Sequence, residues 1–535
     1  MKGESFDILI RNGKIIDGTG NPWFYADVGV RDDKIASIGD LSEEDGRRII
    51  DASGLIVSPG FIDIHAHTDV YHIVNPTGDS FVKQGVTTNL IGNCGGSVAP
   101  VSDHMRPHYE VILKRYGLDI DWSTIGDFLE KVKRNGVSIN VATLVGASTV
   151  RMAIMGMEGR SPTKAELEKM KRLVAEAMED GAFGLSTGLW YAPGGYADTD
   201  EVVELAKVVA RYGGIYATHI RSEENELIEA IREAIEIGEK AKIPVEISHH
   251  KAAGGRRNWG KVKETLEMIE ESRKRGIEST CDVYSWTASS TGFTAYLPHW
   301  VHEGGVQRLV ERLLNHETRA KIKNDMKTET RVNVEEIGWE NLVISDSPKH
   351  REYQGKNLAE LSTKKGVDPY DFFFDLIVEE EGRGSLVVFE MSPEDVDTVI
   401  KSPLSMIAGD ASALAPTGAM GEIKPHPRNY GNFVNVLGEY VRERGVLRLE
   451  EAVRKMTSMP AQKLGIFNRG LLRVGALADI VVFDPKTVAS RATYMNPHQF
   501  PMGVEWVIVN GVVTVKEGEH TGERAGKVLR KSMFN

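Results

Sequence analysis

The sequence predicts an α/β protein: a (β/α)8 TIM-like barrel, a small β-sandwich domain formed by both termini, and an insertion near the barrel mouth. Three observations support this prediction. Short apolar runs alternate with amphipathic helical stretches through the middle of the chain. The two ends instead show alternating β patterns around turn residues. With 535 residues, the chain is long enough for a large barrel and a second module.

Eight apolar runs are the candidate barrel strands. Helical stretches with a 3.6-residue period separate several of them, as in LEKMKRLVAEAMED and LIEAIREAIEIGEKA. Parallel strands with helical crossovers favour a closed barrel. An open doubly wound sheet is the alternative, but no glycine-rich phosphate loop follows an early strand. The candidate strands are Phe61–His65, Val86–Ile91, Ile139–Val145, Ala182–Ser186, Ile215–His219, Val245–His249, Glu278–Tyr284 and Ser405–Asp410.

Hairpin signals mark both ends of the chain. ILIRNGKIIDG, VGVRDDKIASIG and WVIVNGVVTV each alternate apolar residues around a turn pair, and DIVVFDP is a short buried strand. The turn pairs are Asn12-Gly13, Asp32-Asp33 and Asn510-Gly511. We therefore expect both termini to fold into one β domain, with two separate β appendages as the alternative.

One connection between candidate strands is abnormally long. About 120 residues separate Tyr284 from Ser405, whereas a βα connection needs only a few residues beyond its helix. We interpret residues from about 292 to 350 as an insertion over the barrel mouth, followed by the helix that precedes the last strand. The expected domains are 1–58 and 468–535 for the β domain and 59–467 for the barrel.

Charge and cysteine content exclude several classes of protein. The formal net charge of -12, from 65 Lys and Arg against 77 Asp and Glu, makes nucleic acid and anionic membranes poor partners. No apolar run reaches the roughly 18 residues of a membrane span, and MKGESFDILI lacks a secretory pattern. Cys94 and Cys281 are the only cysteines, so we expect no disulfide framework and a cytoplasmic location.

Ligand-type side chains stand at or just beyond the ends of five candidate strands. In FIDIHAHTD the two histidines are two residues apart, so they point to the same side of the chain. In a barrel, the C-terminal strand ends form one ring where active sites lie. A single histidine at a strand end is usually structural, but six such groups together predict a metal site. They are His65, His67, Cys94, His219, His249 and Asp410.

The types of these side chains suit hydrolysis. A thiolate and two imidazoles bind zinc well, and a water or carboxylate completes the set. A bound metal lowers the pKa of its water to roughly 7 in favourable sites and polarises a carbonyl. Asp410 would accept the proton of that water and pass it to a leaving nitrogen. The set therefore predicts cleavage of an amide bond, whereas Cys281 is expected in the core.

Several longer segments resemble a known family. SPGFIDIHAHTD resembles the amidohydrolase superfamily. GNCGGSVAP, FGLSTGLWYAPGGYA, THIRSE, EISHHKAAG, CDVYSWTASST and HPRNYG resemble the N-acyl-D-amino-acid deacylases, or D-aminoacylases. The resemblance implies zinc-dependent hydrolysis of an N-acyl-D-amino acid to a carboxylate and a free D-amino acid. A small N-acyl amino acid is then the expected partner, and homo-oligomer formation stays open.

The resemblance also implies residue roles. It places one tightly bound zinc on Cys94, His219 and His249, and a second, weaker metal position on His65, His67 and Asp410. Asp410 would be the catalytic acid and base. The residues that resemble substrate-holding groups are Lys251, Tyr284, Ser290 and Arg428.

The residues themselves support part of this assignment. An arginine such as Arg428 grips a carboxylate with two parallel hydrogen bonds. Lys251 lies two residues beyond His249 on the same strand face, so it can reach the same pocket. Ala147 departs from the family pattern, in which many members have a histidine. A cyclic amidase and a non-catalytic scaffold remain the alternatives; the former would want a bridging lysine, and FGLSTGLWY has none.

Overall fold

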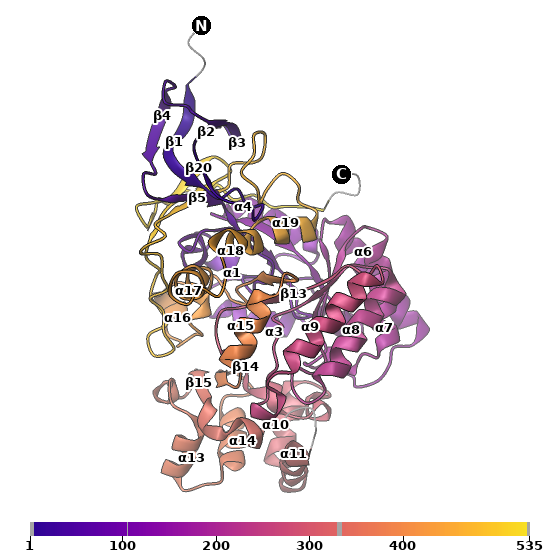
Figure 1. Ribbon diagram of the computed structural model, residues 1–535. Helices are drawn as coiled ribbons and strands as arrows, with labels where there is room; N and C mark the ends of the chain where they lie inside the picture. The colour runs from indigo at the N-terminus through magenta and orange to yellow at the C-terminus, as the bar shows by residue number, and fades with distance from the viewer. Residues whose placement is uncertain (1–4, 104, 329–333, 532–535) are drawn as a thin grey trace.

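The computed structural model describes residues 5–103, 105–328 and 334–531, and its centre is a closed barrel (Figure 1). One parallel sheet has the order β17-β13-β12-β11-β10-β9, and a second has the order β6-β7-β8. Backbone hydrogen bonds join the two sheets: Asp410 N–H donates to His65 O at 2.8 Å, and Phe183 N–H donates to Thr143 O at 2.8 Å. The predicted barrel is confirmed.

All eight candidate strands are present, one of them interrupted at Leu144. Their bounds are β6 (Phe61–Asp63), β7 (Val86–Ile91), β8 (Asn140–Thr143) continued by β9 (Val145–Gly146), β10 (Gly184–Gly188), β11 (Ile215–His219), β12 (Val245–Ile247), β13 (Ser279–Val283) and β17 (Ser405–Ile407).

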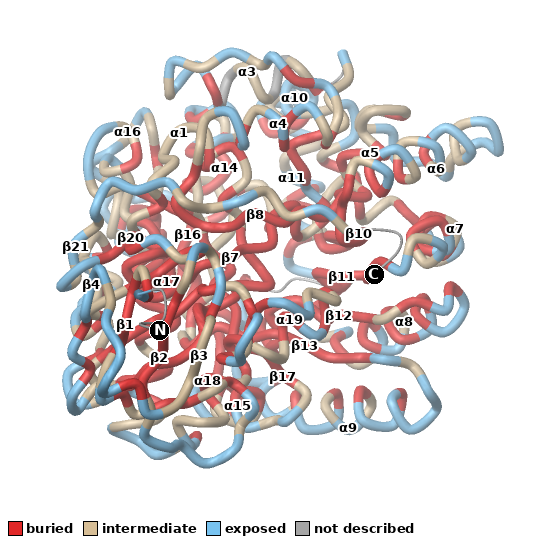
Figure 2. Tube along the Cα trace, turned by 90° about the horizontal axis from the view of Figure 1, so that it is seen from above, coloured by how far each residue is buried: buried red, intermediate tan, exposed pale blue. Residues whose placement is uncertain are grey.

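Helices surround the barrel and shield its strands from water. Figure 2 shows buried strands at the centre and exposed outer faces on α7, α8 and α9. Thr163 begins α6 with a capping box, in which Glu166 bonds back to the Thr163 backbone. The main helices are α4 (Ile125–Asn135), α5 (Ala147–Met155), α6 (Lys164–Glu179), α7 (Thr199–Ala210), α8 (Leu227–Ala241), α9 (Lys261–Lys274), α15 (Pro393–Lys401), α17 (Arg428–Asn435), α18 (Leu449–Met456) and α19 (Ser458–Leu464).

Within the described residues, none of the helices combines the length and apolar character needed to cross a bilayer.

Strands from both termini form one nine-stranded sheet. It has the order β21-β20-β19-β18-β5-β1-β2-β3, with β4 paired to β1. The antiparallel pair of β5 and β18 unites the two ends of the chain, with Ile480 opposite Pro59. The strands are β1 (Phe6–Ile15), β2 (Phe24–Arg31), β3 (Lys34–Gly39), β4 (Gly46–Asp51), β5 (Ile56–Pro59), β18 (Ile480–Phe483), β19 (Val504–Val509), β20 (Val512–Lys516) and β21 (Glu519–His520).

Two of the three expected hairpin turns are present, and one is wrong. Asp32-Asp33 joins β2 to β3, and Asn510-Gly511 joins β19 to β20. At Asn12-Gly13 the chain does not turn back; β1 continues through a bulge, with Asn12 at φ 61°. The Asn12 N–H is satisfied there by Asp27 Oδ1 at 2.8 Å. An Asn-Gly pair tolerates positive φ in a bulge as well as in a turn, so local sequence could not separate the two.

The insertion is larger than expected. Its three-stranded sheet has the order β14-β16-β15, and its own apolar core runs from Phe293 to Val388. The expected end near residue 350 is therefore wrong, because α14 packs in this core and α15 is the helix before the last barrel strand. In Figure 1 the insertion lies at the opposite end of the molecule from the β domain. Its elements are β14 (Ala288–Gly292), α10 (Val306–Leu314), α11 (His316–Thr328), α12 (Val334–Ile337), β15 (Leu342–Asp346), α13 (Leu358–Lys365), α14 (Pro369–Glu379) and β16 (Ser385–Phe389).

A buried polar network attaches the β domain to the barrel. Arg469 forms an ion pair with Asp479, and its other terminal nitrogen lies 2.6 Å from Asn510 Oδ1. Asn510 Nδ2 donates to Asn140 Oδ1 in β8 at 2.8 Å, and Asn140 Nδ2 donates to Asp479 Oδ2 at 3.1 Å. Removing one charge from such a buried pair leaves the other without compensation.

We expect Arg469→Met to lower the free energy of unfolding by about 3 kcal/mol, because it strands the buried Asp479 carboxylate. Urea titration of the purified variant measures this loss. Arg308→Met breaks an exposed pair with Glu311 and is expected to change the free energy much less. Equal effects of the two substitutions would contradict the importance of the network.

Candidate metal centre and active site

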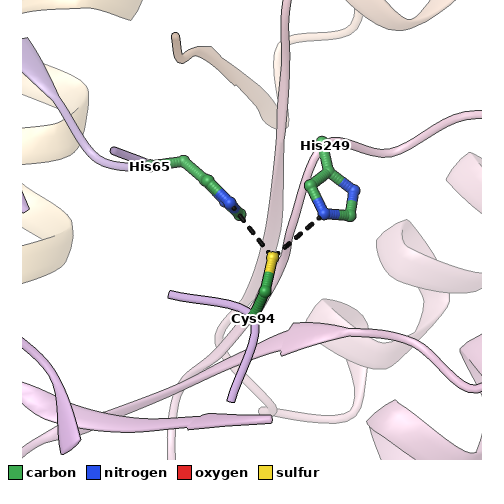
Figure 3. A group of neighbouring side chains, drawn as sticks. All are labelled: His65, Cys94 and His249. Carbon is green, nitrogen blue, oxygen red and sulfur yellow. Dashed lines mark hydrogen bonds between the residues drawn. The ribbon is translucent and has the colours of Figure 1, made fainter. Parts of the chain in front are cut away.

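Cys94 lies between two histidines that come from different strands. Its Sγ is 3.4 Å from His65 Nε2 and 3.4 Å from His249 Nε2. Figure 3 shows both imidazole rings directed at the sulfur from opposite sides. His65 follows β6 and His249 follows β12, so closure of the barrel is what brings these segments to one point.

The other predicted ligands adjoin this trio. Asp410 Oδ1 is 3.2 Å from His67 Nε2 and 3.6 Å from His65 Nε2. The His219 ring is 4.4 Å from the His249 ring, measured between centroids. Three overlapping groups result, each with ligand atoms within 4.8 Å of one another: His65, Cys94 and His249; His65, His67 and Asp410; His219, Glu223 and His249.

This grouping agrees with the resemblance for one metal position and differs for the other. His65, His67 and Asp410 form the set that the resemblance implies. Cys94, however, groups with His65 and His249, while His219 groups with Glu223 and His249. His249 therefore belongs to both sets, and all six predicted ligands lie in one continuous constellation.

Three of these residues have an unusual backbone conformation. Cys94, His249 and Asp410 have φ values of 51°, 36° and 47°. This left-handed region is uncommon for residues other than glycine, and it persists where the surroundings enforce it, often at functional sites. At the neighbouring Gly95, a Cβ would stand 2.6 Å from the Gly188 backbone nitrogen, so only glycine lets this loop pack on β10. The strand ends thus turn sharply to direct their side chains into the pocket.

Two buried aspartates position the strand ends, and the sequence analysis assigned them no role. Asp63 Oδ1 accepts hydrogen bonds from the His65 and Gly409 backbone N–H groups, at 3.1 and 2.9 Å. Asp282 Oδ1 accepts from the His249 backbone N–H at 2.7 Å. The sequence does contain a pattern that could have indicated this role: an acidic residue lies inside each of the apolar runs FIDIH and TCDVY.

Glu223 is the functional residue that the sequence analysis missed. Its Oε1 lies 2.9 Å from His249 Nδ1 and 2.5 Å from Lys251 Nζ, and its Oε2 lies 3.5 Å from His219 Nε2. Lys251 Nζ is also 2.8 Å from His249 Nδ1. The Glu223 carboxylate can accept a proton from both groups, and by accepting the Nδ1 proton it favours the tautomer that leaves Nε2 free as a ligand. The pattern that could have indicated a role for Glu223 is THIRSE, in which Glu223 follows His219 by four residues.

The pKa values indicate that the acidic groups of the centre are ionised and lie among cationic side chains. Burial would raise the pKa of the Cys94 thiol, but His65 and His249 lower it well below its usual value. Burial opposes ionisation of Asp410 too, and the Arg428 guanidinium, with NH1 2.8 Å from Oδ2, lowers that pKa well below its usual range. The same competition lowers the pKa of Glu223, because Lys251 is close. Burial would lower the pKa of His67, but Asp410 and Cys94 raise it to about 10, so cations balance these anions in the structure. A metal ion that binds the imidazoles would replace their protons.

The donors fit zinc in distance and in type. A tetrahedral zinc with Zn–S of about 2.3 Å and Zn–N of about 2.0–2.1 Å separates its sulfur and nitrogen ligands by about 3.5 Å. The two distances from Cys94 Sγ to histidine nitrogens are 3.4 Å. His219 is buried, and within the described part of the chain neither of its ring nitrogens has a hydrogen-bond partner. An imidazole in this situation is suited to hold a metal.

A cavity of about 200 Å³ opens beside the ligands. Five predicted ligands line it, and His65 lies behind them, fully buried. The four predicted substrate residues also line it: Lys251, Tyr284, Ser290 and Arg428. The Arg428 guanidinium lies 4.6 Å from the centre of the Tyr284 ring. Ser290 comes from β14, so the insertion supplies part of the wall. Lining residues that the sequence analysis did not name include Trp190, Tyr191, Glu223, Glu224, Tyr296 and Glu390.

The two cysteines provide a matched test of the metal centre. We expect Cys94→Ser to weaken zinc binding at least about tenfold, because it removes the thiolate at the centre of the cluster. Cys281→Ser should retain the metal, since Cys281 is buried in β13 outside the cavity. Metal analysis of dialysed protein measures both. Equal zinc in the two variants would rule out Cys94 as a ligand.

We expect Glu223→Gln to weaken zinc affinity by about 10- to 100-fold, because the amide no longer favours the ligand tautomer of His249. Competition with a chelator measures the affinity. Glu229→Gln, exposed on α8, is the matched control. An unchanged affinity in Glu223→Gln would limit Glu223 to binding Lys251.

Known proteins are similar to this chain in sequence and architecture over nearly its whole length. A model of the amidohydrolase family matches residues 48–515. The D-aminoacylase of Alcaligenes xylosoxydans xylosoxydans is 35% identical, over 99% of this chain and 98% of the relative. The N-acyl-D-aspartate deacylase of the same organism is 36% identical, over 98% and 95%.

A solved structure of a deacylase is also similar to this chain over nearly its whole length. The N-acyl-D-glutamate deacylase from Bordetella bronchiseptica, complexed with zinc and a phosphonate mimic of the tetrahedral intermediate, is 34% identical with a TM-score of 0.84. The match covers 98% of this chain and 100% of that one. The resemblance to the N-acyl-D-amino-acid deacylases is thus confirmed, and the chain belongs to the amidohydrolase family.

Proposed function

We propose that this protein is a zinc-dependent deacylase that hydrolyses the amide bond of N-acyl-D-amino acids to a carboxylate and a free D-amino acid. The observation that carries the proposal is the cavity in which a thiolate, imidazoles and Asp410 face Lys251 and Arg428. Relatives of nearly full length carry this activity in their names. We assign the tight zinc to Cys94, His219 and His249, and a weaker position to His65, His67 and Asp410, with Cys94 near both positions.

Asp410 is the proposed acid and base. Zinc, when bound, would polarise the scissile carbonyl and make water more acidic. Burial would raise the Asp410 pKa, but Arg428 and the neighbouring histidines lower it well below its usual range, so its carboxylate is ionised at neutral pH and readily gives up a proton that it has accepted. Asp410 takes the proton of the attacking water as the C–O bond forms. It then donates that proton to the amide nitrogen as the C–N bond breaks.

Two buried cations are proposed to hold the substrate carboxylate. Lys251 and Arg428 are 4% and 6% exposed, so a carboxylate between them would be shielded from water. The arginine fork can bind both carboxylate oxygens, and the Tyr284 and Ser290 hydroxyls can donate further hydrogen bonds. In the structure Arg428 forms an ion pair with Asp410, so a bound substrate would share or replace that contact.

The D configuration of the substrate is supported by the named activities of the relatives. Geometry requires three attachment points to fix chirality: the carboxylate, the carbonyl and the side chain. We further propose a cytoplasmic enzyme that acts on free small molecules, without nucleic acid or membrane partners. Two free cysteines and the net charge of -12 support this assignment.

A panel of N-acetyl-D- and N-acetyl-L-amino acids, incubated with the zinc-loaded enzyme, tests the function. We expect cleavage of D substrates, and a loss of at least about a hundredfold in kcat for Asp410→Asn, because the proton acceptor is gone. The variant should keep the tight zinc. Asp200→Asn, exposed on α7, should retain activity. Cleavage of neither enantiomer by the zinc protein would favour a cyclic amidase instead.

A further inference from the structure

Two glutamates in the cavity wall take no part in the proposed hydrolysis. Glu224 and Glu390 line the cavity and are 2% and 6% exposed. They converge at Gly254. The Gly254 N–H donates to Glu390 Oε2 at 3.1 Å, and a Cβ added to Gly254 would lie 2.7 Å from Glu224 Oε2. Two carboxylates from distant parts of the chain therefore share one side of the pocket, the acidic wall.

The charge of Glu390 is not neutralised by its hydrogen bonds. Its Oε1 accepts from Ser289 Oγ at 2.5 Å and its Oε2 from the Gly254 N–H, and both donors are neutral. The two Lys or Arg side chains that line the cavity are already paired with other carboxylates: Lys251 with Glu223, and Arg428 with Asp410. Burial raises the pKa of Glu390, so a nearby cation would favour its ionised form.

Aromatic rings complete the acidic wall. Trp190, Tyr191 and Tyr296 line the same cavity. Burial raises the pKa of Tyr296 well above its usual value, and the charges of Glu390 and Glu224, which line the same cavity, raise it further. Ring faces and carboxylates both attract organic cations. This combination is unsuited to an anionic group, which would meet two like charges.

We propose that the acidic wall recognises a cationic group on the substrate, either the ammonium or guanidinium of a D-amino-acid side chain or an amine on the acyl chain. The inference rests on the proposed deacylase function and adds a substrate class to it. Relatives are named for D-aspartate and D-glutamate substrates. In this pocket such side chains would face Glu224 and Glu390, so we expect them to be poor substrates.

The test compares kcat/KM of the zinc-loaded enzyme for N-acetyl-D-lysine, N-acetyl-D-norleucine and N-acetyl-D-glutamate. We expect lysine to exceed norleucine by about tenfold or more, because norleucine lacks the charge-assisted contact, and glutamate to be the poorest, because its carboxylate would meet like charges. Glu390→Gln keeps the size of the side chain and removes its charge, so the lysine-to-norleucine ratio should fall about tenfold. Glu264→Gln, exposed on α9, should keep the ratio of the wild type.

A second pair of substrates tests whether the cation that the acidic wall recognises lies on the acyl chain. 6-Aminohexanoyl-D-norleucine is compared with heptanoyl-D-norleucine, which has the same chain length without the charge. A Glu390-dependent preference in this pair assigns the acidic wall to the acyl chain, and one in the lysine series assigns it to the side chain. No cation preference in either series, or a preference unchanged in Glu390→Gln, overturns the proposal.

Failure of the function and failure of the inference give different results. Calorimetric binding of N-acetyl-D-lysine to the Asp410→Asn variant, against N-acetyl-D-norleucine, reports recognition without turnover. Preferred binding of the lysine derivative, with no cleavage by the wild type, supports the acidic wall and contradicts the deacylase. Cleavage of norleucine and glutamate derivatives as fast as lysine, with no preference for 6-aminohexanoyl over heptanoyl, supports the deacylase and overturns the acidic wall.

Discussion

The hydrogen bond from the Asp410 N–H to His65 O joins the first strand of the barrel to the last. His67 N–H donates to Ala411 O at the same seam, and Ser412 Oγ donates to His67 O. These bonds link segments about 345 residues apart in sequence. They set the relative positions of His65, His67 and Asp410 through the backbone itself. Backbone hydrogen bonds therefore hold the rim of the barrel in place where the proposed metal ligands meet, which is the condition for a constellation that works at distances of a few ångströms.

The centre combines opposing electrostatic demands. A buried thiolate, Asp410 and Glu223 lie together, and each would be costly to desolvate alone. Arg428 and Lys251 each compensate one carboxylate, and the histidines lie between them. The same two cations are those that a substrate carboxylate would need. Ligand binding at this site is thus an exchange of partners among buried charges, in which a substrate carboxylate would share or replace the contact between Arg428 and Asp410.

Local sequence was sufficient for the elements and for most of the rim. The eight strands followed from apolar runs, and the ligands from their position at or beyond strand ends, because both signals are confined to a few neighbouring residues. Contacts between residues that are distant in sequence could not be predicted from local sequence. Glu223 and Asp282 act through contacts between strands, and Glu390 reaches the cavity from the insertion. The phenylalanines of PYDFFFDL could have faced either core, so the extent of the insertion was not readable from pattern alone.

Three residues at the rim occupy a backbone conformation that costs roughly 1–3 kcal/mol each for a side chain with a Cβ. Glycine would adopt this conformation without that cost, so the stability of the fold alone would favour glycine at all three positions. A descendant that no longer needed the chemistry would gain stability by losing Cys94, His249 and Asp410. In this chain the strain at all three positions is therefore stability given up for the chemistry proposed at the rim.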